Sequence, residues 1–273
     1  MPIITIFRGA FSGGPEVADK VATQLGYRSV SREVLVEASR RYGIPEAKFT
    51  EILETEPSWW EKWREGLRLY RIALQASMCE VVLQGSQLVY HGHMGHELLP
   101  GVSHVLKVLI TATLEYRIDQ VRAREGLDDA AARRYIDHVD KARTRRLESV
   151  FGADWRDSSR YDLVVNVARM DLGTASHLIV EAAGRKEFQP TAESEQAFQN
   201  LTVAARAQAM LVMSPKTRNL NISIQAERGV VRVAGILTQP ALQQEIVRLV
   251  EGVEGVTKVE ADFESPPIEY MFP

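Results

Sequence analysis

Two glycines near the start of the chain have the spacing of a phosphate-binding loop. Gly9 and Gly14 fit the pattern G-x-x-x-x-G-K-[S/T], in which backbone N–H groups and the N-terminus of the following helix hold an anion. Pro15 stands where the pattern has lysine, and Glu16 stands where it has serine or threonine. The sequence therefore predicts an anion cradle that lacks its usual cation. The residues predicted to contact the bound phosphates are Arg8, Gly9, Ser12, Gly13 and Gly14.

A strand and a helix must flank this loop to position it. A β-branched run over residues 3–7 precedes the glycines, and apolar residues spaced for one helical face follow at Val17, Val21 and Leu25. Further apolar strands alternate with helices. The predicted strands cover 27–30, 88–91, 105–111 and 161–166, and the predicted helices cover 32–42, 45–56, 59–84, 114–124 and 171–186. This alternation predicts an α/β domain with a doubly wound, parallel sheet in three layers.

The pattern changes after a polar stretch that contains Pro190. We predict a first domain over residues 1–187 and a second domain over 197–265, separated by a linker at 188–196 and followed by a tail at 266–273. In the second domain a helix precedes two strands joined by a tight turn, and another helix and strand follow. The order α-β-β-α-β predicts a small α+β domain.

Composition and charge argue against several classes of protein. The chain has 273 residues, of which 45% are hydrophobic, and a net charge of -3, so general nucleic-acid binding is not expected. The single cysteine, Cys79, is typical of a reducing compartment. No signal peptide is visible, and no run approaches the ~20 apolar residues that cross a bilayer. We expect a cytoplasmic protein.

Four segments together resemble the cytidylate kinase-like branch of the P-loop nucleoside monophosphate kinases. The resemblance covers about the first 187 residues and depends on the order and spacing of these segments. They are Ile4-Thr5-Ile6-x-Arg8 with Ser12-Gly13-Gly14 and Glu16; Val89 to Gly95; Val108-Leu109-Ile110 with Glu115-Tyr116-Arg117; and Asp140-Lys141-x-Arg143 with Trp155 and Tyr161 to Asn166. The C-terminal region is similar to a BON domain, through Gly229 to Gly235 and Val253 to Val259.

The resemblance implies ATP as phosphoryl donor, Mg²⁺ as its cofactor, and a lid of basic residues that neutralises the transferring phosphoryl group. A solvated basic helix, with charges paired to Asp137 and Asp140 within the helix, is the alternative to a lid. Ser12 is the hydroxyl left in the loop for Mg²⁺. The predicted catalytic lid residues are Arg122, Lys141, Arg143 and Arg146.

Three positions depart from the family pattern. Pro15 replaces the arginine usual there, Ser31 replaces an aspartate at the end of the second strand, and Gly92-His93 replaces Gly-Arg after the third. A neutral imidazole offers a hydrogen bond but not the bidentate fork of arginine. Arg8 is our hypothetical replacement for the lost charge, provided that its side chain turns inward. The predicted acceptor contacts are Ser31, Arg32, Gly92 and His93.

The histidines around the third strand have a second interpretation. His91, His93 and His96 form H-x-H-x-x-H, and with Glu97 they are an alternative candidate for a metal site. The acceptor pocket already accounts for a polar cluster at this strand-to-turn position. We therefore predict no metal ligand among the side chains.

Two functions remain open at this point, and whether the protein is an enzyme remains open with them. One is ATP-dependent phosphoryl transfer to a nucleotide or a related small acceptor, with the BON-like domain as a sensor. The other is a catalytically weak or inactive nucleotide-binding protein that signals through the BON-like domain. The expected partners are small nucleotides and no nucleic acid. For the C-terminal domain they are a protein, a lipid or a second copy of the chain.

Overall fold

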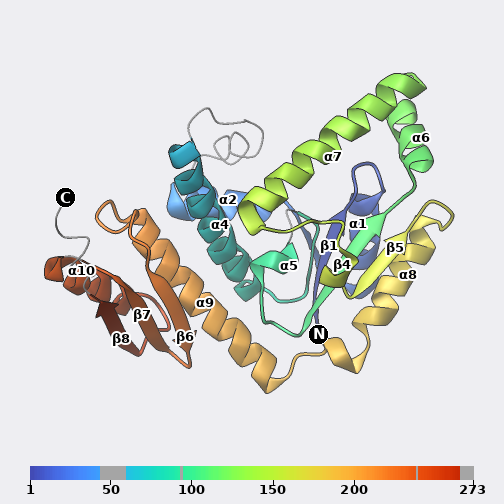
Figure 1. Ribbon diagram of the computed structural model, residues 1–273. Helices are drawn as coiled ribbons and strands as arrows, with labels where there is room; N and C mark the ends of the chain where they lie inside the picture. The colour runs from blue at the N-terminus through green and yellow to red at the C-terminus, as the bar shows by residue number, and fades with distance from the viewer. Residues whose placement is uncertain (44–59, 93–94, 238, 265–273) are drawn as a thin grey trace.

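A five-stranded parallel sheet forms the first half of the molecule (Figure 1). The computed structural model describes residues 1–43, 60–92, 95–237 and 239–264. The strand order is β2-β3-β1-β4-β5. The bounds are Ile3–Arg8 for β1, Arg28–Val30 for β2, Leu88–Tyr90 for β3, Val105–Thr111 for β4 and Leu163–Asn166 for β5. The predicted parallel α/β sheet is confirmed, and the predicted helix at 45–56 lies outside the described residues.

Alternate side chains of the strands enter two separate cores, because successive residues of a strand point to opposite faces. Ile4 packs in one core with α1 (Gly14–Leu25) and α8 (Leu172–Ala183). Ile3 packs in the other with α2 (Glu33–Tyr42) and α4 (Trp60–Leu83). Both residues are fully buried. The sheet is therefore the middle of three layers, as predicted.

Two successive helices lie beside the loop that follows β1 (Figure 1). They are α6 (Leu114–Glu125) and α7 (Asp129–Phe151), and a short helix α5 (Gly95–Leu98) follows the third strand. Ile118 and Val121 of α6 pack against Ala132 and Ile136 of α7 in a small core of their own, which Phe11 of the loop joins. The pair is thus a helical flap held together by its own apolar contacts.

The C-terminal region forms a second, three-stranded sheet in the order β6-β7-β8. Its elements are β6 (Ser223–Glu227), β7 (Val230–Ile236), α10 (Pro240–Glu251) and β8 (Lys258–Glu264). β6 and β7 are antiparallel, whereas β7 and β8 are parallel. The turn between β6 and β7 needs positive φ at Arg228 (49°) and Gly229 (82°). The predicted α-β-β-α-β order is confirmed.

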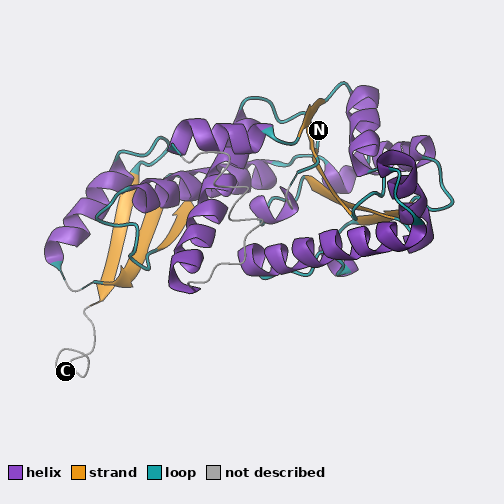
Figure 2. Cartoon of the chain, turned by 90° about the horizontal axis from the view of Figure 1, so that it is seen from above, coloured by secondary structure: helices purple, strands orange, loops and turns teal. Residues whose placement is uncertain are grey.

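The helix that opens this region belongs to two cores. α9 runs from Ala192 to Met213, so it begins inside the predicted linker, where Thr191 forms a capping box with Ser194. Phe198 lies on the face of α9 that packs with α4, and Ala207 lies on the face that packs with the second sheet. Figures 1 and 2 place the two sheets at opposite ends of the molecule with α4 and α9 between them.

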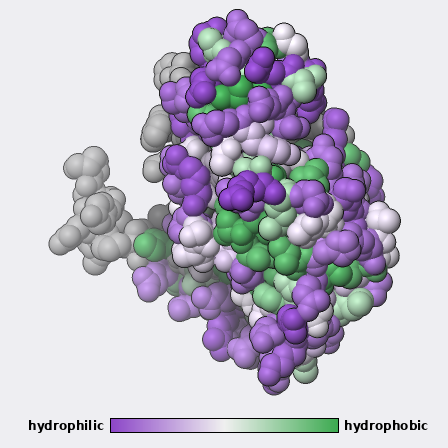
Figure 3. Space-filling model, turned by 90° about the vertical axis from the view of Figure 1, so that its right-hand side faces the viewer, coloured by the Kyte–Doolittle hydropathy of each residue, from purple (hydrophilic) through white to green (hydrophobic). Residues whose placement is uncertain are grey.

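The side of the molecule that carries β5 and α8 is of mixed polarity. Figure 3 shows apolar surface there, interrupted by polar side chains. β5 is an edge strand, and Val164 on it is 43% exposed. Within the described ranges, no helix is both long and apolar enough to cross a membrane.

Candidate active site

The glycine loop between β1 and α1 has the backbone of an anion cradle. Gly13 adopts φ 72°, a conformation that glycine takes without strain, and α1 begins at the next residue. The amides of Gly13, Gly14 and Glu16 donate no hydrogen bond to a described residue. Pro15 has no N–H, so the loop lacks both the lysine ammonium of the usual pattern and one backbone donor.

The Ser12 hydroxyl is occupied within the loop. Its side chain is buried, and Oγ lies 2.9 Å from the carbonyl oxygen of Gly9 and 3.1 Å from that of Ile110. These contacts tie the loop to the end of β4. A hydroxyl directed at two backbone carbonyls is poorly placed to ligate a metal, so the structure gives Ser12 a structural contact where the sequence left it for Mg²⁺.

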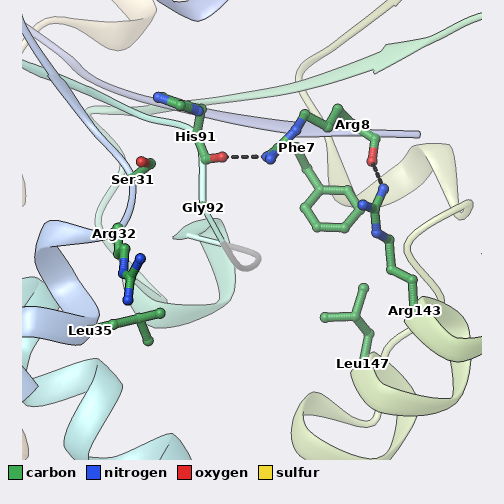
Figure 4. A pocket seen from close by; sticks show the side chains of 9 residues that line it. All are labelled: Phe7, Arg8, Ser31, Arg32, Leu35, His91, Gly92, Arg143 and Leu147. Carbon is green, nitrogen blue, oxygen red and sulfur yellow. Dashed lines mark hydrogen bonds between the residues drawn. The ribbon is translucent and has the colours of Figure 1, made fainter. Parts of the chain in front are cut away.

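Arg8 turns inward across the start of α1. A Cβ added at Gly14 would overlap the aliphatic stem of Arg8, so glycine is needed there for this approach. The Arg8 guanidinium donates a hydrogen bond to the carbonyl oxygen of His91, at the end of β3 (Figure 4). Burial lowers the pKa of Arg8, and Glu16 nearby raises it, but an arginine at this depth stays charged. A partly buried cation therefore lies beside the loop.

Arg143 of α7 reaches the same point from the flap. Its Nη1 lies 2.6 Å from the backbone oxygen of Arg8, and its Cζ lies 5.8 Å from the centre of the Phe7 ring (Figure 4). Leu147, one turn later, is buried in a cluster with Phe7 and Leu109. Because residues four apart share a helix face, this packing fixes the direction of Arg143.

Two cavities meet at these arginines. The loop cavity, of about 480 Å³, is lined by residues 8–16, by Arg143 and by flap residues that include Arg124 and Tyr135. The second cavity, of about 280 Å³, is lined by the ends of β1, β2 and β3 and by α7 (Figure 4). Arg8 and Arg143 line both cavities. A group held between the cavities would thus lie between two guanidinium groups.

The second cavity contains most of the predicted acceptor residues. Ser31, Arg32 and Gly92 line it, while His93 lies outside the described residues. Gly92 lets the chain pass closely under Tyr90, because a Cβ at Gly92 would overlap the tyrosine ring. Burial and the nearby Arg8 lower the pKa of His91, so its ring is neutral at neutral pH.

The structure brings only part of the predicted lid together. Of the lid residues with described side chains, Arg143 lines the cavities, whereas Arg122 and Lys141 do not. Arg122 lies 3.9 Å from Asp119, and Lys141 lies 2.8 Å from Asp137, both within one helix and both exposed. Arg122 and Lys141 therefore lie on solvated helix faces, which was the alternative to a role in the lid. The side chain of Arg146 lies outside the described set.

Arg117 lines neither cavity, but it makes contacts beside the site that the sequence did not single out. Its Nε donates to the carbonyl oxygen of Ala10 at 2.6 Å, and its Nη2 lies 2.7 Å from Oδ2 of Asp140. Arg117 is 9% exposed and joins the loop, α6 and α7 in one contact set. The sequence did contain a signal for this contact, because Arg117 and Asp140 both lie in the segments that carry the family resemblance.

Of the alternative metal site, His93 lies outside the part of the chain that the structure describes. No group of three His, Cys, Asp or Glu side chains there lies close enough to hold an ion. His96 is buried, packs edge-on to Tyr161 at 4.8 Å and has a pKa lowered to about 3 by burial. It is therefore a neutral core residue.

The parallel sheet in this order, the glycine loop between β1 and α1 and the helical pair beside that loop make up the kinase-like α/β fold that the sequence predicts. The model of the cytidylate kinase-like family matches residues 3–169, and the BON domain model matches residues 200–266. This chain belongs to the cytidylate kinase-like family and carries a C-terminal BON domain.

Similar proteins agree with this assignment. A cytidylate kinase of Methanopyrus kandleri is 30% identical over 170 residues, which cover 61% of this chain and 85% of that protein. A cytidylate kinase of Pyrobaculum aerophilum is 26% identical over 66% of this chain and 92% of its own length. The crystal structure of an uncharacterized protein from Eubacterium ventriosum matches 68% of this chain and all of its own, with a TM-score of 0.53 and 21% identity, which shows the fold alone.

Proposed function

We propose that this protein binds ATP in the loop cavity and transfers its γ-phosphoryl group to a nucleoside monophosphate in the second cavity. The observation that carries the proposal is that Arg8 and Arg143 line both cavities. A phosphoryl group passing from one cavity to the other would lie between two cations. The names of the cytidylate kinase relatives favour CMP as the acceptor.

In the reaction, an oxygen of the acceptor phosphate forms a bond to the γ-phosphorus, and the bond from that phosphorus to the bridging oxygen of ADP breaks. Negative charge spreads over the transferring oxygens, so positioning and electrostatics supply most of the catalysis. Arg8 and Arg143 stabilise this charge with guanidinium N–H donors, and the free amides of Gly13 and Gly14 hold the donor phosphates. Arg8 thereby replaces the cation missing at Pro15.

Magnesium fits the loop cavity, because the carboxylate of Glu16 lines that cavity and hard cations prefer oxygen ligands. When bound, Mg²⁺ neutralises phosphate charge and aligns the β- and γ-phosphates. The protein contributes the enclosure: Phe11 of the loop lies 5.6 Å from Tyr135 of α7, ring centre to ring centre. This contact joins the flap to the loop on one side of the cavity.

A regulatory nucleotide-binding protein is the second candidate. Pro15 favours it, because the loop loses a cation and a backbone donor at one position. In that case nucleotide binding would persist with little turnover, and the BON domain, which α9 ties to α4, would transmit the bound state.

Calorimetric titration with Mg²⁺–ATP and with CMP, alongside a coupled assay of ADP release, tests both candidates. We expect both ligands to bind and ADP release to depend on CMP. Arg143→Ala should reduce turnover by about 10²–10³-fold. Lys141→Ala, on the same helix but exposed and paired with Asp137, is the matched control and should leave turnover unchanged. Binding without turnover would favour the regulatory protein, and absence of binding would overturn both.

A further inference from the structure

The carboxylate of Glu16 forms no hydrogen bond with a described residue, and its charge acts on the nearby Arg8, whose pKa it raises. Glu16 is the third residue of α1, it is exposed, and its side chain lines the loop cavity. A glutamate at this helix position often caps the helix by accepting the N-cap N–H, but the side chain makes no such bond here. It forms no ion pair with a described residue either. A carboxylate without a hydrogen bond or close ion pair therefore lines the cavity that we propose for the donor phosphates.

The position of Glu16 in the loop pattern suggests what this charge is for. In G-x-x-x-x-G-K-[S/T] the final residue supplies a side-chain oxygen to Mg²⁺. Glu16 occupies that position, and the Ser12 hydroxyl is already directed at two carbonyl oxygens. Among the residues that line the loop cavity, Glu16 carries the only carboxylate. Mg²⁺ is commonly held by one or two carboxylates together with substrate phosphates and water.

Charge balance leads to the same assignment. Relative to the pattern, Pro15 removes one positive charge, which Arg8 restores from the strand before the loop, and Glu16 adds one negative charge. Without a metal ion, the Glu16 carboxylate repels the donor phosphates. A divalent cation between carboxylate and phosphate compensates the added charge. Nucleotide binding in this loop should therefore depend on the metal more strongly than in a loop with serine or threonine at this position.

We propose that Glu16 is a direct ligand of the divalent cation that accompanies the donor nucleotide, and that this carboxylate makes nucleotide binding conditional on the metal. The inference rests on the proposed donor site. It differs from that proposal because the donor site would also exist if Glu16 only repelled phosphate. If Glu16 binds the metal, removing its charge should weaken ATP binding in Mg²⁺. If Glu16 only repels phosphate, removing its charge should tighten ATP binding.

The experiment compares the wild-type protein, Glu16→Gln and Glu193→Gln. Glu193 is the control, because it is an exposed glutamate in the first turn of α9. Each protein is titrated calorimetrically with ATP in EDTA and again in excess Mg²⁺. Binding of Mn²⁺ to each protein–ATP complex is then followed by electron paramagnetic resonance. Neither readout requires turnover.

We expect Mg²⁺ to tighten ATP binding in the wild type and the control. In Glu16→Gln this gain should fall by about tenfold or more, with Mn²⁺ affinity reduced to a similar degree. A variant that keeps the full gain would overturn the assignment. The assignment would also be overturned if Glu16→Gln bound ATP more tightly than the wild type by the same factor in EDTA and in Mg²⁺. Glu16 would then act only by repelling phosphate. If the wild type binds no ATP in either condition, the donor site itself is refuted.

Discussion

At the scale of single residues, the cation of the site comes from the strand before the loop. Arg8 ends β1, and its stem lies over Gly14, so its charge enters near the position that lysine occupies in the usual pattern. Two hydrogen bonds hold Arg8 in this place: its guanidinium donates to the carbonyl oxygen of His91, and its own carbonyl oxygen accepts from the guanidinium of Arg143. A guanidinium that is partly buried and held by hydrogen bonds loses little entropy when it binds phosphate, which favours its use in catalysis.

Arg8→Ala should lower kcat for phosphoryl transfer by about 10²–10³-fold and weaken ATP binding, because one transition-state cation is lost. Arg8→Lys should recover only part of kcat, since an ammonium lacks the planar fork. Steady-state kinetics with ATP and CMP, together with calorimetric ATP titration, measure both effects. Unchanged ATP affinity in Arg8→Ala would refute the role of Arg8. Thermal melts should confirm that each variant remains folded at the assay temperature.

His96 provides a prediction about pH. Burial lowers its pKa from 6.5 to about 3, so the folded protein keeps the ring neutral while the unfolded chain protonates it below about pH 6.5. The unfolded state then binds more protons, and the free energy of unfolding falls with decreasing pH, by up to about 1.4 kcal/mol per pH unit. This loss continues down to the folded pKa.

Urea unfolding at about pH 7 and about pH 5 measures this loss, and His96→Phe supplies the comparison. The variant retains an aromatic ring against Tyr161 but cannot titrate. Its stability should depend less on pH than that of the wild type across this interval. Equal pH dependence in the two proteins would mean that His96 is protonated in the folded state.

At the scale of elements, a charged contact adds to the apolar packing between the flap and the loop. Arg117 on α6 binds the carbonyl oxygen of Ala10 and the carboxylate of Asp140 on α7. Asp140 lies one turn before Arg143, so the same contact sets the position of the helix that delivers Arg143. The other oxygen of Asp140 is buried without a hydrogen-bond partner among the described residues, which makes Arg117 its main compensation.

Arg117→Met should reduce the free energy of unfolding by about 2–3 kcal/mol, because it leaves a partly buried carboxylate unpaired. The double variant Arg117→Met with Asp140→Asn should recover part of this loss, since the unpaired charge is then removed. Guanidinium unfolding of the wild type, both single variants and the double variant measures the coupling. Additive losses in the double variant would show that the two side chains act independently.

The sequence predicted elements better than side-chain directions. The strand predicted at 105–111 is β4 without a shift, because a buried parallel strand is a continuous apolar run. Lys141 and Arg143 are two positions apart on one helix, so they cannot face the same cavity, and the structure selects Arg143. The placement of Arg8 depends on the missing Cβ of Gly14 and on a carbonyl 83 residues away, which no local pattern contains.

At the scale of the whole molecule, charged contacts add to the apolar packing between the two halves. Arg206 on α9 lies 2.6 Å from Glu80 on α4, and Arg41 on α2 lies 3.0 Å from the same carboxylate. The Glu80 side chain is 7% exposed. The hydrogen bond from Arg206 to the Glu80 carboxylate raises the pKa of Arg206. α2 begins beside the second cavity, so the BON domain is tied to an element of the candidate site.

Phe198 gives the test of this connection, because it is 8% exposed and packs in the core shared with α4. Phe198→Ala should lower the free energy of unfolding by about 3–5 kcal/mol through the cavity that it leaves. Met210→Ala, also on α9 but at a position 42% exposed, should change it by less than about 0.5 kcal/mol.

Tryptophan fluorescence makes the measurement specific to the first domain. All four tryptophans of the chain lie before residue 188, whereas Phe198 lies beyond the predicted linker. If α9 completes the core of the first domain, guanidinium unfolding monitored by tryptophan fluorescence should shift in Phe198→Ala by the full amount. It should also coincide with unfolding monitored by circular dichroism. If the C-terminal region folded as an independent unit on a linker, the fluorescence transition would stay where it is in the wild type.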